Sequence, residues 1–238
     1  MDVGQSILDQ RKDPERYLAI TYLGAAFSAV RLYREWNLGP TAAVRRPQRT
    51  DLRADFLAED ASNLVLVLDA LRQDYSVRQT ITEYLRRFHP DFEEVEQTLV
   101  SGYTQLFLRE KGLGEGLPAT RLSDGTLRYL SLLAILCHPE PPPLVCLEEP
   151  ELGLHPDIIP TIAELLVAAA ERTQLIVTTH SDLLISALSD HPEAVIVCER
   201  DEGGTHLRRL EAESLKKWLK EYSLGDLWLK GELGGTRW

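Results

Sequence analysis

The stretch LVCLEEP, residues 144–150, decides the fold of this 238-residue chain. Its four apolar residues follow Pro143 and predict a buried strand of a parallel sheet. A second apolar run, LIVTT at 175–179, predicts another strand of the same sheet. The two strands alternate with helical patterns, which lie at 126–137, 157–170 and 182–188. This alternation predicts an α/β fold with a mostly parallel sheet and flanking helices.

Two adjacent carboxylates, Glu148 and Glu149, end the first of these strands. Ligands of open α/β sheets bind at the carboxyl ends of the strands. Glu148 would bind Mg²⁺, which prefers hard oxygen ligands, and Glu149 would position and polarise an attacking water. The alternative is an acidic strand end that only faces solvent. The shaped turn PELGLHP at 150–156 makes that alternative weaker.

The stretch LSDGT, residues 122–126, directly precedes an apolar helix. Ser123 or Asp124 can cap this helix, and Gly125 allows close approach of a backbone. The free N–H groups and positive dipole at the start of the helix, around Thr126, suit a γ-phosphate. Taken alone, the pattern also fits a plain helix cap.

A histidine, His180, follows the second strand. A neutral imidazole at this position could hydrogen-bond a γ-phosphate or the attacking water. A single histidine at a strand end is more often structural. Its place one strand–helix unit after the paired glutamates favours the functional interpretation.

The rest of the chain predicts three parts. Residues 1–93 form a helical insert, with helices expected at 76–88 and at 5–29, where an early break at Pro14 is the alternative to one continuous helix. Residues 94–210 form the α/β part, including an antiparallel hairpin around Ser101-Gly102. Residues 211–238 form a final helix over 211–222 and a tail with Trp228 and Trp238, which packs on the domain or docks a partner.

Composition narrows the function classes. The net charge, −11, argues against a non-specific nucleic-acid binder. A basic cluster, expected to be a solvated loop or else a phosphate contact, comprises Arg45, Arg46, Arg49 and Arg53. Three cysteines without Cys-x-x-Cys spacing predict free thiols in a reducing compartment. No apolar run reaches the ~20 residues of a membrane helix, so we expect a cytoplasmic protein without a membrane partner.

Taken together, LSDGT, LVCLEEP, ELGLHP and TTHS resemble the ATPase heads of the RecF/SMC-type ABC superfamily, especially the overcoming-lysogenization-defect-like group. This resemblance implies an ABC-ATPase-like P-loop NTPase fold that uses ATP and Mg²⁺. It further implies a homodimer, closed through the signature loop LSDGT and the D-loop-like turn ELGLHP. In that dimer Ser123 and Gly125 act on ATP held by the other protomer, while Glu148, Glu149 and His180 act in cis. Near the start, Gln5 resembles a Q-loop glutamine.

The sequence departs from this family pattern in three ways. Glu148 replaces the usual Asp, and His155 stands where the D-loop commonly ends in Asp. The Walker A motif, Gly-x-x-x-x-Gly-Lys-Ser/Thr, does not occur. We therefore expect the fold to be incomplete without an upstream lobe, and the chain alone to be inactive. The phosphate loop would come from a missing N-terminal part or a separately encoded partner.

Two function classes remain. The first is ATP hydrolysis in DNA repair, DNA maintenance or phage defence, with DNA and a nuclease as further candidate partners by family analogy. The second is a degenerate, non-catalytic module that uses its ABC-like surface only to dimerise or to dock. Nucleotide binding separates the two.

Overall fold

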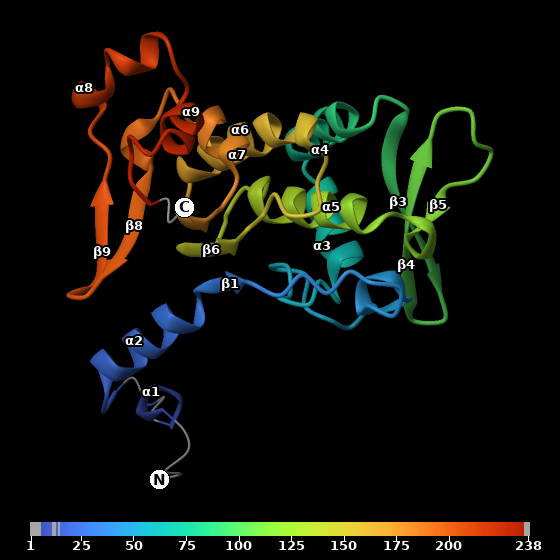
Figure 1. Ribbon diagram of the computed structural model, residues 1–238. Coiled ribbons are helices and arrows are strands. Elements are labelled where there is room, and N and C mark those ends of the chain that lie inside the picture. Colours follow the sequence, from blue (N-terminus) through green and yellow to red (C-terminus); the bar gives the residue numbers. More distant parts are fainter. Residues whose placement is uncertain (1–5, 11–12, 14, 236–238) are drawn as a thin grey trace.

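A three-stranded parallel sheet lies at the centre of the computed structural model, which describes residues 6–10, 13 and 15–235 (Figure 1). Its strands are β1 (Arg31–Tyr33), β6 (Leu144–Glu148) and β7 (Gln174–Thr178), in the order β1-β6-β7. The predicted α/β fold with a parallel sheet and flanking helices is confirmed. β1 is short, and its three residues pair with Val145, Cys146 and Leu147 of β6.

Four helices form the main core with this sheet: α3 (Leu64–Arg72), α4 (Tyr75–Phe88), α5 (Asp124–Leu136) and α6 (Ile159–Ala170). Every side chain of α5 from Thr126 to Leu136 is buried, which explains why its sequence is apolar on all sides. Inward-pointing sheet residues, Tyr33, Val145 and Leu147, belong to the same core. The helix that follows the signature loop is therefore the centre of the molecule.

The opposite face of the sheet is open among the described residues. Leu32, Cys146 and Ile176 lie side by side on it, in register across the three strands. Leu32 is 37% exposed and Ile176 is 51% exposed, although both are apolar. Because side chains alternate between the faces of a strand, one face of this sheet packs on helices and the other presents apolar surface.

A second, antiparallel sheet carries the predicted hairpin, β3 (Phe92–Val100) and β4 (Tyr103–Glu110). Ser101 and Gly102 both have positive φ, 50° and 79°, as a two-residue hairpin turn of type I′ requires. The short strands β2 (Gln48–Arg49) and β5 (Leu117–Pro118) also pair with β4. This sheet leads the chain into the signature loop.

The carboxyl-terminal part has its own small core, formed by Ile185, Val197, Leu210, Leu224, Leu227 and Leu233. It joins α7 (Asp182–Ala187) and α9 (Leu224–Leu229) to the hairpin of β8 (Ile196–Asp201) and β9 (Gly204–Arg209). Trp228 packs against this core, as one interpretation of the tail predicted, whereas Trp238 lies outside the described residues.

The structure corrects the helix prediction at 211–222 and shows an interrupted helix within 5–29. In place of the helix expected over 211–222 there are only α8 (Ala212–Leu215) and a 3-10 turn (Trp218–Lys220). Neither element has a fully buried side chain, so tertiary packing does not stabilise a longer helix here. The helix expected over 5–29 is two helices, α1 (Ile7–Gln10) and α2 (Leu18–Ser28). α2 buries none of its residues, although it is mostly apolar. In the part of the chain that the structure describes, no helix is long and apolar enough to span a membrane.

The three cysteines are free, as predicted, and differ in exposure. Burial raises the pKa of the Cys137 thiol to about 12, while Cys198 is exposed. Since the thiolate is the reactive form, we expect an alkylating reagent at pH 8 to modify Cys198 rapidly and to leave Cys137 unmodified until the chain unfolds. Peptide mass spectrometry with and without denaturant measures both rates. Equal native rates for the two thiols would contradict this placement.

Candidate functional site

The candidate site begins where β6 ends. Glu148 is the last residue of the strand, and Glu149 has a left-handed backbone with φ of 43°. Two hydrogen bonds hold this conformation, from the Glu149 amide to the Thr178 carbonyl (2.9 Å) and from the Leu152 amide to the Glu149 carbonyl (3.1 Å). A residue other than glycine is strained in the left-handed conformation, and the proline that follows Glu149 disfavours it further. Strained residues of this kind concentrate at functional sites.

His180 lies next to Glu149, as the sequence predicts. Its Nε2 is 3.8 Å from Glu149 Oε1. The imidazole is 84% exposed and the Glu149 side chain 36% exposed, so both remain accessible to a ligand from solvent. The parallel register of β6 and β7 produces this pairing, because it aligns Glu148 with Thr178.

The loop between β7 and α7 is fixed from both sides. The Thr179 hydroxyl donates to the Glu151 carboxylate and accepts from the Ser181 amide at 3.0 Å. Ser181 in turn caps α7 through the Leu184 amide, at 3.2 Å. The turn after β6 and the loop that carries His180 are therefore tied together by side chains.

Two residues beside the glutamates were missed by the sequence analysis, Trp36 and Arg128. The Trp36 indole donates to the Glu148 carbonyl (3.2 Å), and the Arg128 guanidinium donates to the Glu149 carbonyl (3.1 Å). Arg128 also lies over the Trp36 ring, 5.1 Å from its centroid. Burial lowers the pKa of Arg128, and the carboxylates of Glu151 and Glu149 partly oppose this shift. Trp36 could have been expected here, because it follows a strand parallel to β6.

The signature loop caps α5. The Ser123 hydroxyl accepts from the Thr126 amide at 3.0 Å and lies 2.8 Å from the Thr126 hydroxyl. Ser123 and Asp124 are exposed, whereas Thr126 is 7% exposed and turned inward. A Cβ on Gly125 would lie 2.9 Å from the Gly153 carbonyl, so only glycine lets this loop approach the D-loop-like turn so closely. Both elements therefore contribute to one surface.

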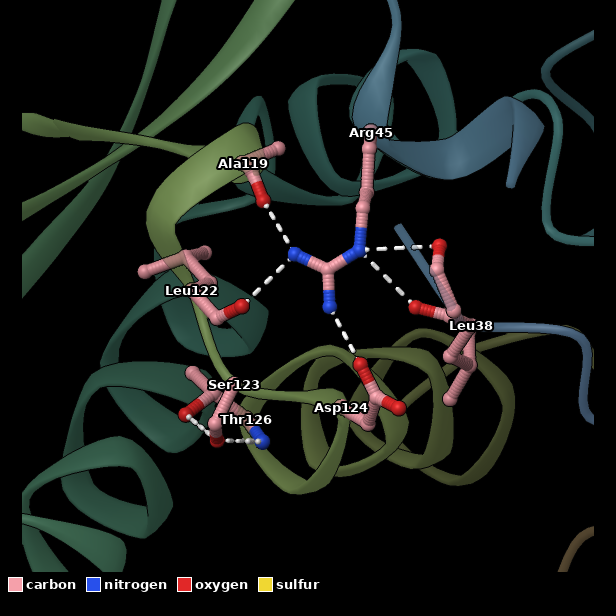
Figure 2. A network of polar contacts seen from close by, with 8 residues as sticks. Leu38, Arg45, Ala119, Leu122, Ser123, Asp124 and Thr126 are labelled. Atoms are coloured by element: carbon pink, nitrogen blue, oxygen red, sulfur yellow. Dashed lines mark hydrogen bonds and ion pairs between the residues drawn. The ribbon is translucent and has the colours of Figure 1, made fainter. Parts of the chain in front are cut away.

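Arg45 corrects the prediction of a solvated basic loop. It is 6% exposed, and Figure 2 shows its guanidinium surrounded by carbonyls from two sides and by the Asp124 carboxylate. Arg45 is thereby fully engaged within the protein and unavailable for an external phosphate. Of the other arginines in the cluster, Arg49 pairs with Asp51 and Arg53 lies 3.7 Å from Asp55.

The remaining predicted residues lie as follows. No described residue pairs with or hydrogen-bonds the exposed Glu148 carboxylate, so its hard oxygens fit a role as Mg²⁺ ligands. His155 caps a 3-10 turn (Pro156–Ile158), and its Nδ1 accepts a hydrogen bond from the Asp157 amide at 3.3 Å. Gln5 lies outside the described residues.

The α/β fold, the carboxylate pair beside a histidine and the capped glycine loop are the features by which the sequence resembles ABC-type ATPase heads. A family model described as "AAA domain, putative AbiEii toxin, Type IV TA system" matches residues 14–186. The chain belongs to this family, and its expected membership of the AAA-family ATPases is confirmed. Over 81 residues it is 37% identical to the Old nuclease of Escherichia phage P2, a match that covers 34% of this chain and 14% of the nuclease.

Among solved structures, the chain is similar to heads of SMC proteins. An SMC head bound to the C-winged helix domain of ScpA matches 62% of this chain and 46% of its own, with 16% identity and a TM-score of 0.49. An SMC head from Pyrococcus furiosus with an extended coiled coil matches 90% of this chain and 50% of its own, with 15% identity and a TM-score of 0.48. At these scores the similarity gives no information on function.

Proposed function

We propose that this chain supplies most of an ATP-hydrolysing head. Glu148 binds Mg²⁺, Glu149 positions the attacking water, and His180 contacts the γ-phosphate or that water. The observation that carries the proposal is the 3.8 Å approach of His180 Nε2 to Glu149 Oε1 at the carboxyl ends of adjacent parallel strands. Both groups face one accessible edge, where a water and a phosphate could contact them together.

The phosphate-binding loop, in this proposal, comes from another segment of the protein or from a separately encoded chain. The sequence has no Gly-x-x-x-x-Gly-Lys-Ser/Thr motif to supply a backbone nest and a lysine. The open sheet face around Ile176, at 51% exposure, offers apolar surface next to the carboxylates on which such a lobe would pack. Without that lobe, the chain by itself is proposed to be inactive.

The signature loop acts in trans, on ATP held by a second copy. Ser123 and Asp124 are exposed at the start of α5, whose free N–H groups favour an anion. The close approach of Gly125 to Gly153 places the D-loop-like turn beside them. One continuous surface would therefore meet the nucleotide and the partner protomer, and ATP would hold the homodimer together.

The test compares nucleotide binding with and without a phosphate loop. We expect Mg-ATP to bind weakly or not at all to the chain alone. Micromolar binding, together with formation of dimers in sedimentation, should appear when the chain is joined to the segment or separately encoded chain that, in this proposal, carries the Walker A motif. A flat titration of the joined protein would overturn the proposal in favour of a non-catalytic interaction module. Hydrolysis by the chain alone would instead overturn the external origin of the phosphate loop.

The biological role proposed is DNA maintenance or defence against phage, with a nuclease as a candidate partner. The match to a phage nuclease and the toxin named in the family description support this direction. DNA would contact a local surface rather than the whole protein, because the net charge is −11. The cytoplasm, where ATP is available and thiols stay reduced, is the proposed location.

A further inference from the structure

A single buried arginine connects the signature loop to the rest of the protein. Arg45 lies in a 3-10 turn (Ala43–Arg45) that no motif distinguishes. Its guanidinium donates to five acceptors, namely the carbonyls of Leu38 (2.8 Å), Gly39 (3.1 Å), Ala119 (2.9 Å) and Leu122 (2.6 Å) and the carboxylate of Asp124. Figure 2 shows this arrangement, with Arg45 between the two groups of carbonyls.

These acceptors come from segments far apart in the sequence. Ala119, Leu122 and Asp124 follow Arg45 by 74 to 79 residues and include the backbone directly ahead of α5. Leu38 lies two residues after Trp36, which contacts Glu148. Arginine suits this position because its rigid fork of N–H donors can satisfy several fixed oxygens at once.

The ion pair between Arg45 and Asp124 also changes the charge at the signature loop. Its side chain is 66% exposed on the loop that would face a phosphate, whereas the Arg45 side chain is 7% exposed beneath it. An unpaired carboxylate beside a phosphate is repulsive, and an adjacent guanidinium removes much of that repulsion. The buried cation thus compensates the one acidic side chain of the signature loop.

We propose that Arg45 is a positioning residue for the signature loop. It holds the loop in place and neutralises the Asp124 carboxylate, so that the start of α5 can contact a phosphate group. The positioning part stands on the hydrogen bonds alone, whereas the phosphate part rests on the proposed function. Arg45 touches no substrate and acts only through the loop.

The first experiment needs no nucleotide. Amide hydrogen exchange of the peptide 119–127 is measured in the full chain for R45M, R45K and R46M, the last being an exposed neighbour as matched control. We expect exchange at least about tenfold faster in R45M, an intermediate rate in R45K because lysine has only three donors, and the wild-type rate in R46M. An R45M peptide that exchanges at the wild-type rate would overturn the positioning role. If R45M does not fold, R45K decides the same question.

The second experiment measures ATP-driven dimerisation of the joined protein by sedimentation. We expect R45M to raise the ATP concentration for half-maximal dimerisation at least about tenfold. In the double variant R45M/D124N, we expect this concentration to be at least about threefold lower than in R45M. If Arg45 had only a structural role, R45M/D124N would dimerise no better than R45M, because Asp124→Asn restores none of the lost hydrogen bonds. That result would overturn the proposal that Arg45 neutralises Asp124. If even the wild type ignores ATP, the proposed function fails while the exchange data still decide the positioning role.

Discussion

Glu149→Gln is expected to stop turnover in the joined head while leaving Mg-ATP bound. A glutamine keeps the size of the side chain but has no negative charge to polarise a water or to accept its proton. The loss of a positioned base typically costs about 10²–10⁴-fold in rate. We therefore expect a fall of at least about 100-fold in the rate constant for hydrolysis, with dimers that persist for longer after ATP is added.

Rapid-quench measurement of phosphate release, together with an ATP-binding titration, checks this expectation. Glu171→Gln is the matched control, because Glu171 is an exposed carboxylate at the end of α6, close to the start of β7 and not to the carboxyl ends of the strands. Turnover of Glu149→Gln within about threefold of wild type would remove Glu149 from the proposed chemistry. A variant that no longer binds ATP would assign Glu149 to binding instead.

Arg128→Met is expected to have the second largest effect. Methionine keeps apolar volume but removes the donor to the Glu149 carbonyl and the cation that lies over Trp36. The Glu151 carboxylate would also lose a nearby positive charge. This loss is costly because Glu151 Oε2 is buried and has no hydrogen-bond partner among the described residues. A lost hydrogen bond to a charged donor costs about 2 kcal/mol, so we expect a clear fall in melting temperature and hydrolysis reduced about tenfold or more.

Thermal unfolding and single-turnover hydrolysis measure the two effects separately. Arg78→Met, on the exposed side of α4, is the control for the loss of one surface charge. Arg128→Lys keeps the charge and should recover part of the stability but less of the rate, because a lysine cannot reproduce the fork geometry. Wild-type stability of Arg128→Met would show that the contact with Glu149 is not needed to hold the turn.

Short-range patterns predicted much of the architecture. The strand at 144–148 matches β6, the hairpin matches β3 and β4, and the helix after LSDGT matches α5, because each depends on local periodicity and turn residues. The approach of His180 to Glu149 was also predictable, since neighbouring parallel strands end at one edge. These features need no knowledge of distant contacts.

Other features depend on contacts that local sequence does not contain. Trp36 meets Glu148 across 112 residues, and Arg45 meets Asp124 across 79. No local pattern marks Arg45 as buried, because arginine is usually exposed. The left-handed Glu149 even opposes the local rule, since a residue before proline favours extended backbone. Tertiary hydrogen bonds override that preference.

The open face of the sheet has a consequence for how such a protein is made. Leu32, Cys146 and Ile176 form an apolar strip, and within the described residues β1 and β7 have no strand on their outer edges. Exposed strand edges beside apolar surface recruit other chains during synthesis. Solubility would then depend on the lobe that is proposed to cover this face, which would act as a chaperone before it took part in catalysis. Co-expression should therefore yield more soluble protein than refolding of the separate pieces.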